Sequence, residues 1–365
     1  MGCVCNIKAY YWILDYINKF NLDLTGITVL TEMASGPYLF TPFIALLSNA
    51  KRVFAVTKDS VWGKRDEIIK DSMHFMRFTD IKQGNLIIVK DKEEIDPSEV
   101  DIITNSGFVR PLNREFINKL KKGTVISLMW ETWELRENEV DLASCIEKGI
   151  PVLGVNEDYP GVDTLRYLGL AVAKVLVEKG FAILDDTYVI VGDSRIGFVI
   201  CETLRKIGAQ TWCYIINDNS RAHVDLEQIY SLRKLDAIIV ANHMTDEVII
   251  GREGALVSSL RLKEKFPFIE IIVVTGRIDY EALKENNISW YPSRIPPEGY
   301  MALSAAYLGA KPVIALNTAG LKVGEITFRA LKREGDLVKG VRRALLHPLV
   351  QDLTPFHKVK YKVPW

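Results

Sequence analysis

The hydrophobic residues of this chain gather in short continuous runs, and segments with helical periodicity separate these runs. Runs rich in Val and Ile, without alternation, are typical of strands that helices cover on both faces of a parallel sheet. The first series of runs lies at 27–31, 52–57, 86–89, 102–104, 125–129 and 151–155. The second lies at 188–191, 211–216, 237–241, 271–275 and 313–316. This alternation predicts an α/β protein with two doubly wound parallel-sheet lobes.

A long helix is expected between the two series, over residues 161–180, where the apolar spacing is that of a helix. We expect it to connect the lobes. The second lobe then comprises residues 161–320. The first lobe comprises residues 1–160 and is completed by residues 321–365, so that the second lobe is inserted into the first.

Composition and charge narrow the function classes. The chain of 365 residues is 48% hydrophobic, and 46 Lys and Arg balance 46 Asp and Glu. Zero net charge argues against a nucleic-acid-binding surface over the whole molecule, because such surfaces need a basic excess. No apolar run approaches the about 20 residues of a membrane span, and the start of the chain lacks a signal-peptide pattern. We therefore expect a cytoplasmic protein that binds neither nucleic acid nor membrane.

The cysteines and histidines give no sign of a metal site. The cysteines, at positions 3, 5, 145, 201 and 213, are odd in number and scattered, and neither residue type shows zinc-ligand spacing. We expect reduced thiols and no bound metal.

The sharpest motif is a glycine loop between a buried run and a helix, reading Gly192-Asp193-Ser194-Arg195-Ile196-Gly197. It is the dinucleotide-binding fingerprint with its middle glycine replaced by Ser194. Gly192 permits the tight turn, and Gly197 lets the helix pack closely on the strand. The helix N-terminus would hold the diphosphate. The motif predicts NAD or NADP as cofactor, and the alternative is a purely structural turn.

A group that binds the cofactor ribose is expected about 20 residues further on. The next run is followed by Asn217, Asp218 and Arg221. Asp218 would favour NAD, whereas Arg221 would pair with the 2′-phosphate of NADP. The choice between the two cofactors stays open.

Ligands of open α/β sheets bind outside the carboxyl ends of the strands. In the second lobe these ends carry Asn242 and His243, then Thr275 and Gly276. We expect Asn242, Thr275 and Gly276 to contact the cofactor. His243 is the first candidate for proton transfer, and the alternatives are a loop cap or a cofactor contact. Strand ends of both lobes are expected to line one cleft.

Two further candidates for the cleft are charged. Glu131 lies between two tryptophans, which would desolvate it and suit it to proton transfer; the alternative is a solvated loop acid. Arg277 would neutralise a carboxylate or phosphate of a small-molecule substrate, and the alternative is a structural ion pair.

At this point the residues resemble the D-isomer-specific 2-hydroxyacid dehydrogenases. The stretch 192–197 is similar to their nucleotide loop, 235–251 and 271–283 to the strands that follow it, and 101–156 to their substrate lobe. The resemblance implies a homodimeric enzyme with a flavodoxin-like substrate lobe and a Rossmann NAD(P)-binding lobe. It also implies hydride transfer, an arginine on the substrate carboxylate, and a histidine that moves the proton.

The chain departs from that family at the positions that bind the substrate and transfer the proton. Asn317 stands where the family has its catalytic histidine, and asparagine cannot exchange a proton near neutral pH. Arg277 is shifted in register, and the glycine-rich substrate loop is replaced by Met-Trp-Glu-Thr-Trp-Glu at 129–134.

These departures leave three functions open. The first is an NAD(P)-dependent oxidoreductase acting on a polar small molecule, and it is the one we expect. The second is an enzyme with tightly bound NAD that performs lyase or hydrolase chemistry on a plan similar to S-adenosylhomocysteine hydrolases. The third is a non-catalytic nucleotide-binding protein.

Overall fold

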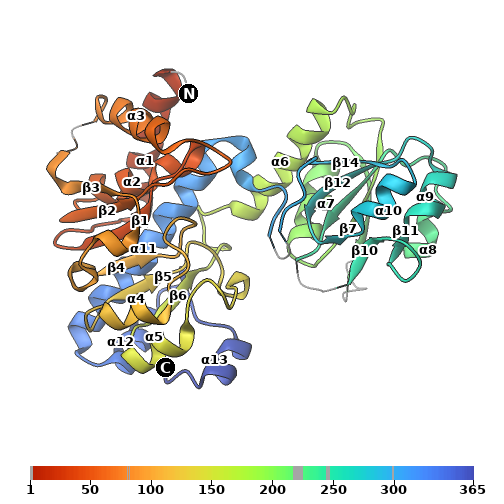
Figure 1. Ribbon diagram of the computed structural model, residues 1–365. Helices are drawn as coiled ribbons and strands as arrows, with labels where there is room; N and C mark the ends of the chain where they lie inside the picture. Colours follow the sequence, from red (N-terminus) through yellow and green to blue (C-terminus); the bar gives the residue numbers. More distant parts are fainter. Residues whose placement is uncertain (1–2, 80, 82, 217–224, 244–246, 298–299) are drawn as a thin grey trace. The chain divides into compact units, whose positions relative to one another are not determined.

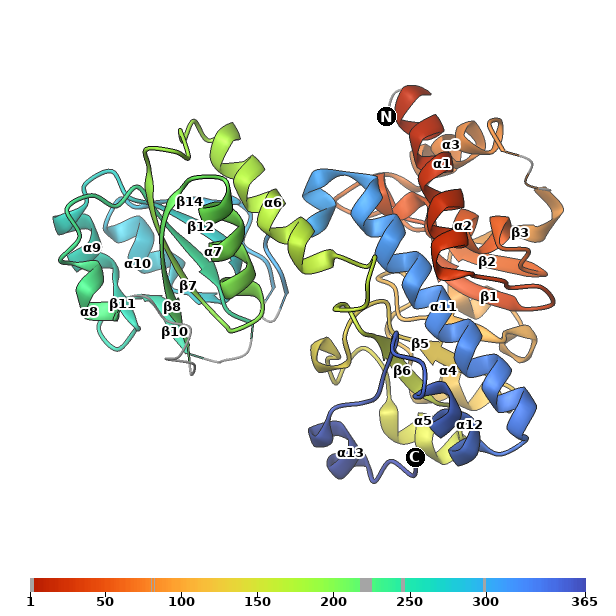
Figure 2. The ribbon, with the colours of Figure 1, turned by 180° about the vertical axis from the view of Figure 1, so that it is seen from behind.

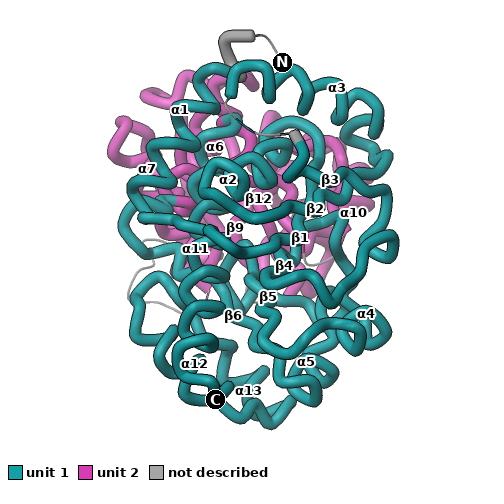
Figure 3. Tube along the Cα trace, turned by 90° about the vertical axis from the view of Figure 1, so that its left-hand side faces the viewer, with its two compact units in different colours: residues 1–163, 309–365 teal, residues 164–308 magenta. Residues whose placement is uncertain are grey.

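The computed structural model describes residues 3–79, 81, 83–216, 225–243, 247–297 and 300–365 (Figure 1). The chain divides into two compact units, coloured separately in Figure 3. Unit 1 comprises residues 1–163 and 309–365, and unit 2 comprises residues 164–308. Unit 2 is therefore inserted into unit 1, and the chain returns at residue 309 rather than after residue 320.

Unit 1 is built on a seven-stranded sheet with the order β15-β6-β5-β4-β1-β2-β3. Its strands are β1 (Thr28–Glu32), β2 (Arg52–Val56), β3 (Leu86–Val89), β4 (Ile102–Thr104), β5 (Val125–Ser127), β6 (Val152–Val155) and β15 (Val350–Gln351). All neighbours pair in parallel except β15 with β6. The order reverses between β1 and β4, which makes their carboxyl ends a topological switch point.

The helices of unit 1 are α1 (Cys3–Phe20), α2 (Thr41–Leu47), α3 (Arg65–Met76), α4 (Arg114–Lys119), α5 (Leu142–Lys148), α11 (Ala310–Glu334), α12 (Leu337–Ala344) and α13 (Pro355–Tyr361). Short 3₁₀ turns lie at η1 (Gly36–Leu39), η2 (Gln83–Asn85), η3 (Lys92–Glu94), η4 (Pro97–Glu99) and η5 (Thr132–Glu134). Helix α11 packs on β4, β5 and β6, and α1 packs on α11 (Figure 2). Fully buried Val and Ile side chains of the central strands fill the core between these layers.

Unit 2 is built on a five-stranded parallel sheet with the order β14-β12-β9-β7-β8. Its strands are β7 (Thr187–Gly192), β8 (Gln210–Ile215), β9 (Ala237–Ala241), β12 (Glu270–Thr275) and β14 (Ser289–Tyr291). A small sheet contains β10 (Val248–Gly251), β11 (Val257–Ser258) and β13 (Arg277–Ile278). The helices are α6 (Thr164–Glu178), α7 (Ile196–Lys206), α8 (Leu226–Ile229), α9 (Ser259–Lys265), α10 (Tyr280–Glu285) and the 3₁₀ turn η6 (Ala305–Leu308). The switch point lies between β7 and β9.

The predicted α/β class with two parallel sheets is confirmed, and one predicted strand is wrong. Residues 313–316 lie inside α11, a helix of 25 residues whose apolar side packs on the sheet of unit 1. Periodicity alone does not distinguish a short apolar run in a buried helix from a buried strand. This error placed the expected end of the second lobe too late in the chain.

Candidate functional site

The glycine loop joins β7 to α7 by a direct contact between backbones. A Cβ atom on Gly192 would lie 2.7 Å from Cα of Gly197 and 2.5 Å from the carbonyl oxygen of Ala241. A Cβ on Gly197 would lie 2.7 Å from Cα of Gly192. Neither position has room for a side chain. The strand end, the helix N-terminus and the end of β9 therefore meet as the dinucleotide fingerprint requires.

Asp193 uses its carboxylate inside this loop. Oδ1 accepts hydrogen bonds from the backbone N–H groups of Arg195, at 2.9 Å, and Ile196, at 2.7 Å. Oδ2 accepts one from the backbone N–H of His243, at 3.0 Å. A negative charge at a helix N-terminus is stabilising. Asp193 thus fixes the turn that leads into α7 and joins the loops after β7 and β9, whereas the sequence predicts that it contacts the cofactor.

His243 lies beside the glycine loop, because its backbone N–H donates to Asp193 of that loop. Its ring Nδ1 is hydrogen-bonded to the hydroxyl of Thr275 at 2.7 Å, and the side chain is half-buried. The backbone N–H of Asn242 donates to the carbonyl oxygen of Thr275 at 3.0 Å. The structure therefore brings His243, Asn242 and Thr275 together at the carboxyl edge of the sheet of unit 2.

Gly276 and Arg277 lead the chain away from this edge. Gly276 has φ of 130°, and a Cβ there would lie 3.0 Å from a methyl carbon of Val240 and 3.1 Å from the carbonyl oxygen of Asn242. Only glycine suits such a turn. Arg277 is exposed and begins β13, which pairs with β10 in the small sheet. Asn217, Asp218 and Arg221 lie outside the described residues.

Two cysteines of unit 2 form a disulfide, so the expectation of reduced thiols is wrong for this pair. Cys201 in α7 and Cys213 in β8 are fully buried, and their Cα atoms are 6.3 Å apart. They meet because α7 packs on β8, a contact that sequence spacing does not reveal. Cys145 is a buried free thiol, and burial raises its pKa above the ordinary value.

Glu131 lies in unit 1 and is buried, so it is not a solvated loop acid. Its Oε2 accepts a hydrogen bond from the indole N–H of Trp133 at 2.6 Å, and its Oε1 accepts one from the amide of Gln351 at 3.3 Å. These partners fix the carboxylate against the loop that replaces the family's glycine-rich segment.

Asn317 does not lie at a strand end, because the run before it is helical. It is buried within α11, and its side-chain amide donates to the hydroxyl of Thr41 in α2 at 2.7 Å. This contact gives Asn317 a structural role within the packing of α11 on α2, and the expectation that it follows a strand is wrong.

Sequence reasoning missed an arginine cluster in unit 1. Arg110 and Arg136 both contact Oε1 of buried Glu139, and the Arg136 contact measures 2.8 Å. The guanidinium carbon of Arg110 lies 5.1 Å from the centre of the Trp130 ring. Arg136 is three residues from Glu139, but Arg110 is 29 residues from it, and no motif links Arg110 to the other residues.

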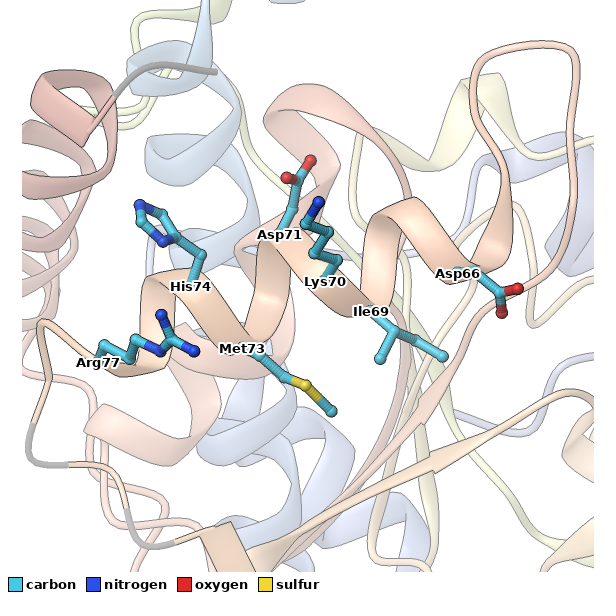
Figure 4. Close-up of a pocket in the computed structure, with 7 residues that line it drawn as sticks. All are labelled: Asp66, Ile69, Lys70, Asp71, Met73, His74 and Arg77. Carbon is cyan, nitrogen blue, oxygen red and sulfur yellow. The ribbon is translucent and has the colours of Figure 1, made fainter.

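The surface hollow in Figure 4 contains none of the predicted site residues. It has a volume of about 560 Å³, and α3 and the residue that follows it supply its whole lining: Asp66, Ile69, Lys70, Asp71, Met73, His74 and Arg77. One helix face does not enclose a small molecule, so we do not assign a site there.

Metal-ligand clusters and membrane-spanning helices are both absent from the described part of the chain. No group of three or more His, Cys, Asp or Glu residues there is placed to hold a metal ion. No helix there combines the length and apolar composition that a membrane span requires.

The sequence matches no family model and no curated protein. The fold is similar to that of a dipicolinate synthase chain from Bacillus halodurans, with a TM-score of 0.53, 14% identity, and coverage of 85% of this chain and 99% of that one. For the A chain of dipicolinate synthase from Bacillus subtilis the TM-score is 0.49 and the sequence identity is 12%, over 86% of this chain and 98% of that one. For NAD⁺-bound 3-phosphoglycerate dehydrogenase from Entamoeba histolytica the TM-score is 0.40 and the sequence identity is 15%, over 70% of this chain and 88% of that one. The chain therefore shares the fold of the first of these proteins, and at this identity the likeness establishes the fold alone.

Proposed function

We propose that this protein is an oxidoreductase that uses NAD or NADP and acts on a small polar molecule. The observation that carries the proposal is the approach of Gly192 and Gly197 at the switch point of unit 2, where a Cβ on either would overlap the other. This arrangement serves to bring a helix N-terminus and bare backbone to a dinucleotide diphosphate. The resemblance to 2-hydroxyacid dehydrogenases supports the same cofactor.

The loop fits the cofactor, with one restriction. Ser194 and the backbone before α7 would hold the diphosphate, and Asn242 and Thr275 would border the next part of the cofactor. When bound, the cofactor accepts or supplies a hydride. The carboxylate of Asp193, however, holds two of the N–H groups that a phosphate would use. We therefore expect weak, exchangeable binding, which separates this proposal from an enzyme with tightly held NAD.

We assign the protein's own chemistry to three residues. His243 exchanges the proton, because the Thr275 hydroxyl fixes its ring beside the glycine loop. Arg277 of unit 2 is assigned to the substrate, which we propose to bear a carboxylate or a phosphate. Glu131 of unit 1 is proposed for proton transfer, the role that its burial suits. We further propose a cytoplasmic homodimer, as the dehydrogenase resemblance implies.

Absorption spectroscopy and native mass spectrometry of the purified protein test the proposal. We expect no dinucleotide to survive gel filtration, and added NADH or NADPH to bind reversibly. Ser194→Asp should abolish this binding by charge repulsion, while Ser194→Asn should keep it. Dinucleotide that persists through gel filtration would favour the bound-NAD alternative. Absence of affinity for either cofactor would contradict the proposal.

A further inference from the structure

Unit 1 has its own switch point, between β1 and β4. The strands β5, β4, β1 and β2 lie side by side in the sheet (Figure 1). The hydroxyl of Thr104 donates to the hydroxyl of Thr31 at 2.9 Å, which joins the ends of β4 and β1. Glu32 ends β1, and Asn105 directly follows β4. Open α/β sheets bind ligands at such an edge.

Three buried polar atoms along this edge have no hydrogen-bond partner among the described residues. They are Oγ1 of Thr57 after β2, Nδ2 of Asn105 after β4, and Nε1 of Trp130 after β5. Thr57 and Asn105 are fully buried. The Oδ1 atom of Asn105 accepts from the backbone N–H of Met129 at 3.0 Å, which fixes the orientation of the amide. The Nδ2 donor of the same amide has no partner among the described residues. Buried polar groups nearly always have partners, so three unmet groups at one edge indicate a bound molecule.

Glu32 lies at the same edge, at the end of β1, and the loop that follows β4 holds its carboxylate. Oε2 accepts from the backbone N–H of Phe108 at 2.9 Å, and the backbone N–H of Gly107 also donates to this carboxylate. A Cβ on Gly107 would lie 3.2 Å from Oε2 of Glu32 and 3.8 Å from Nη2 of Arg110. Because Arg110 packs on Trp130, the three side chains surround the same loop. Burial raises the pKa of the Glu32 carboxyl, against the lowering effects of the Phe108 N–H, the charge of Arg110 and the Gly107 N–H.

The chemistry of these atoms selects a class of ligand. Asn105 Nδ2 and Trp130 Nε1 can only donate, the Glu32 carboxylate accepts, and the Thr57 hydroxyl does both. A ligand hydroxyl can donate to Glu32 while it accepts from the amide or the indole. An anion would be repelled by Glu32, and the charge of Arg110 is already engaged by Glu139.

We propose that this edge of unit 1 binds an uncharged polyhydroxy group of a small molecule, with Glu32, Asn105 and Trp130 as its hydrogen-bonding residues. The inference rests on the proposed function only in taking this uncharged group to be part of the substrate, whose carboxylate or phosphate would bind away from this edge. Binding at the edge itself requires no dinucleotide.

Titration with erythritol, without any dinucleotide and followed by NMR, tests the site. Trp130→Phe and Thr57→Val each remove one unmet polar atom and keep the shape. Each should weaken erythritol binding by about three- to tenfold, the value of one hydrogen bond, and leave the unfolding midpoint unchanged. Trp290→Phe is the matched control, because Trp290 of unit 2 also has an indole N–H without a partner among the described residues. It should leave erythritol binding unchanged.

Glu32→Gln tests the selectivity for uncharged ligands. It should weaken binding of erythritol and strengthen binding of erythronate, the matching carboxylate, because the repelling charge is gone. The inference is overturned if the wild-type protein fails to bind erythritol, prefers erythronate, or responds equally to Trp130→Phe and Trp290→Phe. Since NADH binding is measured separately, such a result would leave the proposed function standing.

Discussion

The carboxylate of Asp193 accepts a hydrogen bond from the backbone N–H of His243 at 3.0 Å, across the switch point between β7 and β9. Unit 1 repeats this relationship, because Glu32 accepts from the backbone N–H of Phe108 across the switch point between β1 and β4. In each unit, a buried carboxylate at the end of the first strand holds the loop that follows the neighbouring strand. Both edges where ligands are expected are thus organised around an internal negative charge.

Asp193→Ala should tighten the binding of NADH. The change removes a negative charge and frees the N–H groups of Arg195 and Ile196 for a phosphate. It also removes two hydrogen bonds at the start of α7, which should lower the free energy of unfolding by about 0.5–2 kcal/mol, the range known for the loss of a helix cap. Calorimetric titration with NADH and chemical denaturation measure the two effects.

Asp336→Ala is the matched control for this prediction. Asp336 caps α12 by accepting from the backbone N–H of Lys339 at 2.9 Å, and it lies in unit 1. Its loss should cost similar stability and leave NADH affinity unchanged. Weaker NADH binding by Asp193→Ala, with the control unchanged, would show that the carboxylate helps to hold the cofactor.

Asn317→Ala should lower stability without affecting the cofactor. The hydroxyl of Thr41 loses its donor in a buried position, which should cost about 1–3 kcal/mol of unfolding free energy. Thermal or chemical denaturation measures this loss, and NADH titration should give the wild-type dissociation constant. Intact stability with lost NADH affinity would instead place Asn317 at the cofactor.

Glu32→Gln should raise stability at neutral pH. Burial raises the pKa of Glu32 in the folded protein. Between the ordinary pKa, about 4.3, and this raised value, the folded chain binds more protons than the unfolded chain. Wild-type stability therefore falls as pH rises through that window, whereas the glutamine variant avoids the loss. Denaturation at several pH values should show an advantage at pH 7 that shrinks towards pH 4, and an advantage independent of pH would contradict this assignment.

The strands and the glycine loop could be predicted because their signals are local. Buried parallel strands require continuous hydrophobic runs such as 237–241. Gly192 and Gly197 are only five residues apart, and their close backbone approach requires glycine at both positions. The run at 313–316 misled the prediction, since a buried helix face and a buried strand are equally apolar over four residues.

The rest of the candidate site depends on contacts between distant residues. Nothing in the local sequence shows that Asp193 turns its carboxylate onto the N–H of His243, or that Arg110 packs on Trp130. Hydrogen bonds to backbone N–H groups leave no side-chain pattern to detect. The polar edge of unit 1 could not be predicted either, because the burial of Thr57 and Asn105 without partners among the described residues depends on tertiary packing.

Titration of NADH into Gly192→Val tests whether the glycine loop binds a dinucleotide. The valine side chain would enter the space held by Gly197 and the carbonyl of Ala241, so nucleotide binding should be abolished. Gly84→Val is the control, because no atom lies within 4 Å of a Cβ there. We predict wild-type affinity for the control and no binding for Gly192→Val in protein that remains folded by circular dichroism. Equal NADH affinity in both variants would contradict the assignment of the glycine loop to a dinucleotide.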